Sequence, residues 1–105
     1  MPKDLLRQRG APDNVIAFHT LVQAPSRVIV LRHLLRGPVV FDELMRELGM
    51  SAAACREAIY ALTEAGYVTD DADASYRRKP SPTRYWALRD RVAADTLDFA
   101  KFVLS

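Results

Sequence analysis

The chain has 105 residues, of which half are hydrophobic and 27% are charged, and its formal net charge is +2. This composition is typical of one globular domain with a single core, and it excludes a disordered chain. No apolar run approaches the roughly 18 residues of a membrane-spanning helix, and the N-terminal residues lack the apolar stretch of a secretory signal. The sequence therefore predicts a flexible charged arm over residues 1–12 and a single domain over residues 13–105.

Two helices are predicted at the start of the domain. The first covers residues 13–23, with Asp13 as its N-cap, and a proline ends it. The second covers residues 27–36, with Ser26 as its N-cap, and a Gly-Pro pair stops it. Apolar side chains recur in the second helix at the spacing of a core-facing stripe, namely Val28, Leu31, Leu34 and Leu35.

A helix-turn-helix is predicted next. A helix over residues 42–48 follows a short extended apolar link, and Gly49 ends it. Ser51 caps the next helix, over residues 52–65, and two helices joined by so few residues outline this motif. One face of the second helix is apolar and is expected to face the core: Cys55, Ala58, Ile59 and Leu62. The opposite face carries Ala52, Ala53, Arg56, Glu57 and Tyr60.

A β-hairpin and a last helix complete the predicted domain. Strands are expected at residues 67–69 and 84–88, so that residues 67–89 form the hairpin, and a helix follows over residues 90–104. Five basic residues and no acid lie between residues 74 and 89, whereas residues 1–66 hold eight basic and seven acidic residues. A basic block on a nearly neutral domain is either a nucleic-acid contact or a solvated loop. Its members are Arg77, Arg78, Lys79, Arg84 and Arg89.

Within this order of elements, four groups of residues stand out: Ser26-Arg27-Val28 through Leu34-Leu35-Arg36-Gly37; Glu43-Leu44 with Glu47-Leu48-Gly49-Met50-Ser51; Ala61-Leu62-Thr63-Glu64-Ala65-Gly66-Tyr67-Val68; and Tyr85-Trp86-Ala87-Leu88. With these residues the chain resembles the winged helix-turn-helix transcription regulators of the ArsR and MarR types. The resemblance covers residues 26–89 and implies an α+β fold, mostly α, with a three-helix core, a β-hairpin wing and extra N- and C-terminal helices. The implied function is a DNA-binding regulator, and specifically a dimeric repressor.

The resemblance places the helix over residues 52–65 in the major groove of duplex DNA, with the basic wing on the phosphates. On its exposed face, Arg56 would read a guanine edge, and Glu57 would accept from a cytosine amine while repelling nearby phosphates. The alternatives are helix propensity for the two alanines and a surface ion pair with Glu57 or Glu64 for Arg56. The expected DNA contacts are Ser51, Ala52, Ala53, Arg56, Glu57, Tyr60, Arg77, Arg78, Lys79 and Arg84.

The two terminal helices carry more apolar surface than one buried stripe needs, which predicts a homodimer. In the last helix, Phe102 lies among Asp95 and Asp98 on the otherwise polar side, beside a broad apolar face. The first helix has a similar excess. The expected dimer contacts are Val15, Phe18, Val22, Leu97, Phe99, Phe102 and Val103.

Residue patterns for catalysis, metal binding and cofactors are absent from the sequence. His19 and His33 are isolated, and Asp70, Asp71 and Asp73 lack the glycine and distal glutamate of a calcium loop. The lone Cys55 excludes an internal disulfide and fits a reducing cytoplasm. We therefore expect no enzyme activity, no metal, no cofactor and no membrane partner. The competing interpretation is a winged-helix module that binds protein, as part of a larger assembly or as a phage accessory factor.

Overall fold

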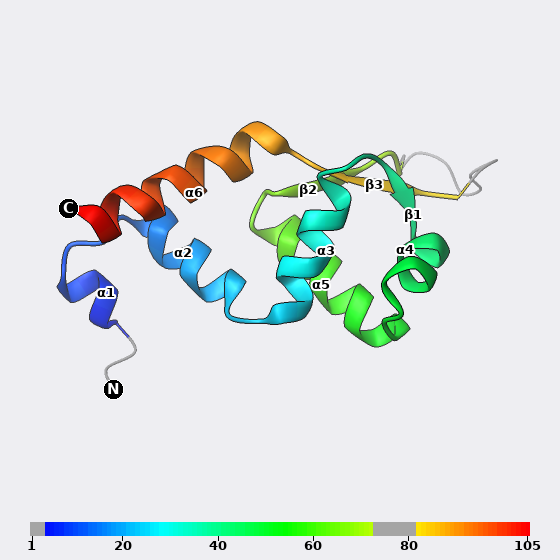
Figure 1. Ribbon diagram of the computed structural model, residues 1–105, viewed down its shortest axis with the longest axis horizontal. Coiled ribbons are helices and arrows are strands. Elements are labelled where there is room, and N and C mark those ends of the chain that lie inside the picture. Colours follow the sequence, from blue (N-terminus) through cyan, green and yellow to red (C-terminus); the bar gives the residue numbers. More distant parts are fainter. Residues whose placement is uncertain (1–3, 73–81) are drawn as a thin grey trace.

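Six helices and three short strands form along the described residues, 4–72 and 82–105, of the computed structural model (Figure 1). The molecule is elongated, with principal extents of 49 × 28 × 23 Å. In chain order the elements are α1 (Leu5–Gln8), α2 (Asp13–Val22), α3 (Pro25–Leu34), β1 (Val39–Val40), α4 (Phe41–Leu48), α5 (Ala52–Glu64), β2 (Val68–Asp70), β3 (Arg84–Ala87) and α6 (Arg89–Leu104).

Helices α4 and α5 form the predicted helix-turn-helix. Gly49 ends α4 in the left-handed conformation, with φ of 64°, which glycine adopts without a Cβ penalty. Ser51 caps α5, and its Oγ accepts a hydrogen bond from the amide of Ala54 at 3.1 Å. The end of α4 at Gly49 and the start of α5 at Ser51 were therefore predicted correctly from local chemistry.

The core lies where α5 packs against α3. The four predicted core residues of α5 are all buried, and two of them, Cys55 and Ala58, are small enough to bring the two helices close together. In α3 the prediction is partly wrong, because Val28 is exposed and Val30 takes the core position. The buried cluster comprises Leu21, Val30, Leu31, Leu34, Val39, Leu44, Cys55, Ala58, Ile59, Leu62, Tyr67, Val68 and Val92.

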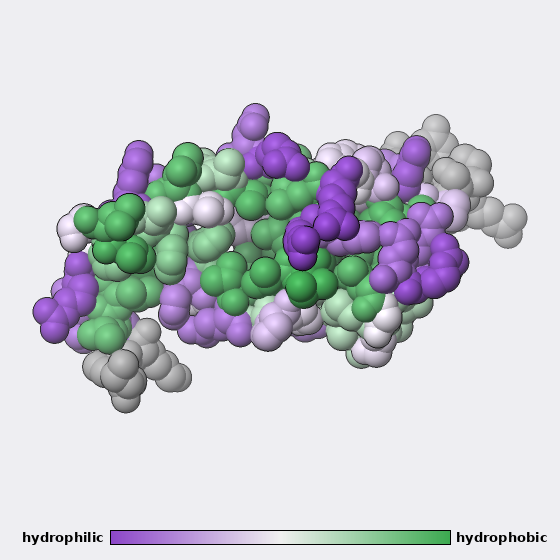
Figure 2. Space-filling model, in the orientation of Figure 1, coloured by the Kyte–Doolittle hydropathy of each residue, from purple (hydrophilic) through white to green (hydrophobic). Residues whose placement is uncertain are grey.

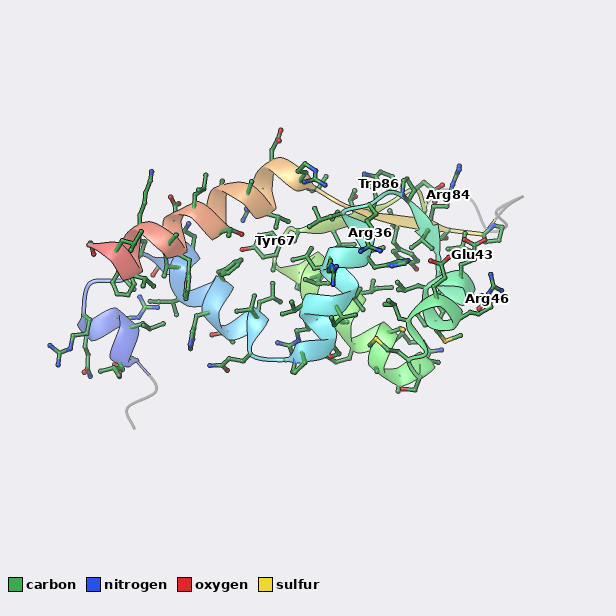
Figure 3. All side chains as sticks on the ribbon, viewed as in Figure 1. Arg36, Glu43, Arg46, Tyr67, Arg84 and Trp86 are labelled. Carbon is green, nitrogen blue, oxygen red and sulfur yellow. The ribbon has the colours of Figure 1, made fainter. Side chains whose placement is uncertain are left out.

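The sheet is antiparallel, with strand order β1-β3-β2. The link before α4, which the sequence predicts only as extended, forms β1 by pairing Val39 with Tyr85. Along β3 the side chains alternate, so that Tyr85 and Ala87 pack on the core while Arg84 and Trp86 lie on the other face (Figure 3).

The terminal helices pack on each other at one end of the molecule, with α6 running back beside α2 (Figure 1). Phe18 of α2 contacts Tyr67 edge-on, with ring centroids 6.2 Å apart, and contacts Phe99 of α6 at 5.6 Å. No single helix within the described ranges is long and apolar enough to cross a membrane. Helices α2 and α3 pass that test only as a pair, which is bent by 101°.

The predicted N-terminal arm is partly structured, which corrects the expectation of a wholly flexible segment. Residues 5–8 form the short helix α1, and the amide of Ala11 donates to Leu6 O at 2.9 Å. Arg7 also pairs with Asp13 across 2.9 Å, which ties this turn to the start of α2.

Candidate nucleic-acid interface

The exposed face of α5 carries the side chains that the sequence assigns to DNA. Ala53, Arg56 and Glu57 are exposed, and Tyr60 is 69% exposed. Ala52 is half-buried at the start of the helix. The structure therefore brings one cation, one anion, one phenol and one small side chain together on a single face of α5.

Arg56 lies toward α4. Its guanidinium carbon is 5.5 Å from the centroid of the Phe41 ring, a cation–π distance. Within the described part of the chain it forms no ion pair with Glu57 or Glu64, the partners that the sequence offered as its alternative role. The Phe41 ring therefore lies beside the guanidinium of an exposed arginine at one edge of α5.

Glu57 lies toward the opposite edge of α5, where α3 begins. Arg27 Nε and Nη2 both donate to Glu57 Oε1, at 3.0 and 2.5 Å. The hydrogen bond to Glu57 raises the pKa of Arg27, so the guanidinium stays charged at neutral pH. Half of the Glu57 side chain remains exposed.

Ser51 is already engaged as the N-cap of α5, where its oxygen is the acceptor. Its hydroxyl hydrogen remains a donor, because a serine hydroxyl both donates and accepts. The expected phosphate contact by Ser51 is compatible with its role as a cap.

The base of the hairpin is held by a cluster of bonds between Arg84 and Asp71. The Arg84 amide donates to Asp71 Oδ1 at 2.8 Å, and Arg84 Nε lies 3.3 Å from Asp71 Oδ2. The Arg84 side chain is exposed and partly neutralised by this acid. The other expected wing contacts, Arg77, Arg78 and Lys79, lie outside the described residues.

The expected dimer contacts divide into two groups. Val15 is completely buried inside the chain, which corrects its assignment to a surface. Phe18 and Phe99 pack on each other between α2 and α6, and Val22 and Phe102 are half-buried. Leu97 and Val103 are exposed, at 60% and 63%. Figure 2 shows hydrophobic residues over parts of α6, α2 and α3, with hydrophilic residues among them and at both the α1 and the α4 ends of the molecule.

The orientation of α6 follows from a buried polar cluster that the sequence did not predict. Tyr67 Oη donates to Asp95 Oδ2 at 2.6 Å, and Asn14 Nδ2 donates to Asp95 Oδ1 at 3.1 Å and to Asp98 Oδ2 at 2.8 Å. Arg91 Nε lies 3.5 Å from Asp95 Oδ2. Figure 3 shows Tyr67 between the terminal helices and the end of α5.

Opposing effects set the pKa of Asp95. Burial raises it, but the hydrogen bonds from Tyr67 and Asn14 and the charge of Arg91 outweigh burial and hold it below the ordinary value. Burial and the same hydrogen bond to Asp95 raise the pKa of the Tyr67 phenol. The two aspartates of α6 therefore face α2 beside Phe99, each hydrogen-bonded to Asn14, and an apolar stripe of the helix faces outward.

Two residues of functional interest were missed by sequence reasoning. Arg27 lies 30 positions before Glu57, and no local pattern links them. The sequence pattern predicts Asp95 to be an exposed acid on the polar side of an amphipathic helix. In the described part of the chain it is instead the one charged residue that is buried. In that part of the chain, no group of three or more histidine, cysteine, aspartate or glutamate side chains is placed to hold a metal ion.

Comparison with known proteins places this geometry in a class. Residues 24–70, from the start of α3 to the end of β2, match the model described as bacterial regulatory protein, arsR family. No curated protein matches the sequence.

The fold is similar to those of several solved structures. An ArsR-like transcriptional regulator from Rhodococcus sp. RHA1 has a TM-score of 0.69 at 18% identity, over 87% of this chain and 80% of that one. The transcriptional repressor BigR from Xylella fastidiosa has 0.64 at 19%, over 99% and 96%. The homodimeric winged helix-turn-helix DNA-binding domain of Mb0332 from Mycobacterium bovis has 0.62 at 20%, over 81% and 74%. At these low sequence identities, the structural similarity establishes the fold alone.

The protein is thus a winged helix-turn-helix protein. Of the two types that the sequence resembles, ArsR is the one whose model its helix-turn-helix segment matches, over residues 24–70. Together the match and the fold support a DNA-binding transcriptional regulator.

Proposed function

We propose that the protein is a dimeric transcriptional repressor that places α5 in the major groove of its operator. The observation that carries the proposal is the exposed face of α5 within the ArsR-type segment, where Arg56, Glu57 and Tyr60 stand out from a helix packed by its other face. An α-helix of this kind fits the major groove, which presents a distinct pattern of donors and acceptors for each base pair.

Each exposed side chain has a role that matches its chemistry. Arg56 donates to the O6 and N7 acceptors of a guanine, the commonest specific contact of arginine. Tyr60 donates to a phosphate, and Ala52 and Ala53 permit close approach beside a thymine methyl. Ser51 donates to a phosphate from the N-terminus of α5, where the helix dipole favours an anion.

The wing supplies affinity in this proposal. Arg77, Arg78, Lys79 and Arg84 belong to a segment, residues 74–89, that contains no acid. Cations that neutralise phosphates release counterions, which contributes most of the non-specific affinity for DNA. Since Arg84 also pairs with Asp71, its contribution is smaller than that of an unpaired arginine.

The dimer and the repressor role are supported by similar structures and by the surface of α6. One similar structure is described as homodimeric, and another as a transcriptional repressor. The exposed Leu97 and Val103 offer an apolar contact to a second copy. Two recognition helices in such a dimer read half-sites about one DNA turn apart, and a dimer bound there blocks access to a promoter. The proposal includes a cytoplasmic location and no catalytic activity.

Selection from a randomised duplex library tests the proposal. We expect the protein to enrich a two-fold symmetric sequence, and Arg56→Ala to weaken binding to the enriched duplex by about tenfold, because one bidentate base contact is lost. The matched control is Arg9→Ala, which removes an exposed arginine beside α1 at the far end of the molecule and leaves the affinity within about twofold. A protein that enriches no sequence, or equal losses in both variants, would contradict the proposal.

A further inference from the structure

The carboxylate of Glu57 is held by one of its two oxygens. Both Arg27 donors, Nε and Nη2, reach Oε1. Oε2 accepts no hydrogen bond from any residue that the structure describes. A carboxylate oxygen accepts only, so Oε2 is a free acceptor on a carboxylate whose other oxygen is fixed.

Glu57 lies in line with the other outward side chains of α5. Ala53, Glu57 and Tyr60 follow one another at i, i+4 and i+7, which places them along one stripe of the helix. All three are exposed. The methyl side chain of Ala53 leaves space beside Glu57, so a base edge can approach the carboxylate.

Charge is the difficulty for a glutamate in this place. A lone carboxylate on a helix that enters the major groove is repelled by the phosphates on both sides. The Arg27 guanidinium cancels that charge at hydrogen-bonding distance, and its planar group fixes the carboxylate more firmly than a flexible ammonium would. The Arg27 side chain is itself only one-quarter exposed, so it is constrained by the packing at the start of α3.

We infer that Arg27 is a positioning residue for base recognition: it neutralises Glu57 and fixes Oε1, so that Oε2 accepts from the exocyclic amino group of a cytosine. Cytosine is the base whose only major-groove hydrogen-bonding group is a donor, the N4 amine. The inference rests on the proposed function and adds to it a base preference, with a residue outside α5 that sustains it.

The test measures base preference rather than affinity. In selections from a randomised duplex library, the wild type should prefer cytosine at one position in each half-site by about tenfold. Glu57→Gln should move this preference toward adenine, which a glutamine contacts with both a donor and an acceptor. Arg27→Met, of similar length but uncharged, should reduce the cytosine preference to within about twofold, because Glu57 is then free to turn and repels the phosphates. Arg27→Lys should keep part of the preference, since the positive charge remains.

Two further variants separate positioning from a structural role. Arg32→Met removes an exposed arginine from the same helix and should leave the base preference unchanged. In a Glu57→Gln background, Arg27→Met should not alter the preference further, because Arg27 acts only through Glu57. The ratio of affinities for two duplexes does not depend on the fraction of folded protein, so an unstable variant still gives a valid result.

The outcomes are distinct. An Arg27→Met protein that binds all sequences more weakly but keeps the wild-type preference would show that Arg27 is structural only, and the inference would be overturned while the proposed function stands. A wild type that enriches DNA without a cytosine preference also overturns it. A wild type that enriches no DNA overturns both the inference and the proposed function.

Discussion

Asp95 is buried between the terminal helices, and its partners show why an acid is tolerated there. Each of its oxygens accepts a hydrogen bond, from Tyr67 at 2.6 Å and from Asn14 at 3.1 Å, and Arg91 supplies a nearby positive charge. A buried carboxylate without such partners would be expensive, whereas one with paired oxygens fixes the groups around it. Tyr67 follows α5 by way of Gly66, so this cluster joins α5 to the terminal helices.

Removing the Tyr67 hydroxyl tests this cluster. At pH 7 we expect Tyr67→Phe to lower the free energy of unfolding by about 2 kcal/mol, because a hydrogen bond to a buried charged group is lost. The pKa of Asp95 is lower in the folded than in the unfolded state, so its stabilising effect is complete above the ordinary value of 3.8 and is lost as the pH falls through the folded value. The difference between Tyr67→Phe and the wild type should therefore shrink below about pH 4.

Urea unfolding at pH 7 and at pH 3 measures the effect. The control is Tyr60→Phe, which removes the same hydroxyl from a side chain that is 69% exposed and should change stability by less than about 0.5 kcal/mol at either pH. Equal losses in the two variants, or a loss in Tyr67→Phe that grows as the pH falls, would argue against the cluster as described.

At the scale of the element, α6 packs against α2 with a different side from the one that the sequence predicts. Its inward side pairs Asp95 and Asp98 with α2, and its outward side carries Ala93, Leu97, Ala100 and Leu104. The outward residues alternate by four, three and four positions, the spacing of a helix–helix seam. A shallow groove of about 330 Å³ adjoins this stripe, lined by Leu35, Arg89, Val92, Ala93, Thr96 and Leu97. We therefore propose that a dimer uses this outer side of α6, which includes the predicted contact Leu97, rather than Phe18 and Phe99, which pack on each other.

If the outward apolar stripe of α6 forms the dimer contact, a charged residue within it should break the dimer. Leu97→Asp should convert the dimer into a monomer near 11.8 kDa in light scattering at micromolar concentration, because a carboxylate is costly in an apolar interface. The fold should persist, since Leu97 is 60% exposed within the chain. Arg46→Asp, at an exposed position of α4 at the other end of the molecule, is the control and should leave the dimer intact. A wild type that is already monomeric would exclude the dimer.

Local chemistry made most of the elements predictable. Ser51 and Gly49 mark the joint between α4 and α5, and the spacing of Cys55, Ala58, Ile59 and Leu62 fixes which face of α5 is buried. These signals act over a few residues, so the sequence displays them directly.

Contacts between distant residues were not predictable in the same way. The ion pair of Arg27 with Glu57 joins two helices 30 positions apart, and Asn14 meets Asp95 across 81 positions. A helical wheel ranks faces by hydrophobicity alone, so it placed the aspartates of α6 outward. In the structure, hydrogen bonds with Tyr67 and Asn14 hold these aspartates toward α2 instead. The sequence identified the exposed face of α5. It did not show that Glu57 pairs with Arg27 of α3 or that Arg56 lies over the Phe41 ring of α4.

At the scale of the whole molecule, the two ends differ. The terminal helices form one end with its apolar surface, and α4 and the sheet form the other (Figures 1 and 2). The cations that the proposal assigns to DNA belong to α5 and to the wing sequence, whereas the proposed dimer surface lies on α6. In the proposed arrangement, DNA contact and self-association therefore use different surfaces of the chain, and a dimer through α6 would carry two copies of α5.

Salt dependence of binding to random-sequence duplex DNA tests the central claim most directly. We predict that the wild type binds at about 50 mM salt and loses affinity steeply by about 200 mM, since each phosphate contact contributes about −0.9 to the log–log slope. Changing Arg77, Arg78 and Lys79 together to alanine should weaken binding and make the slope shallower by about two to three. Changing Arg7, Arg9 and Lys101 to alanine removes the same charge from α1 and α6 and should leave the slope near that of the wild type. A wild type that does not bind at low salt, or a slope that the three wing residues do not alter, would contradict the account.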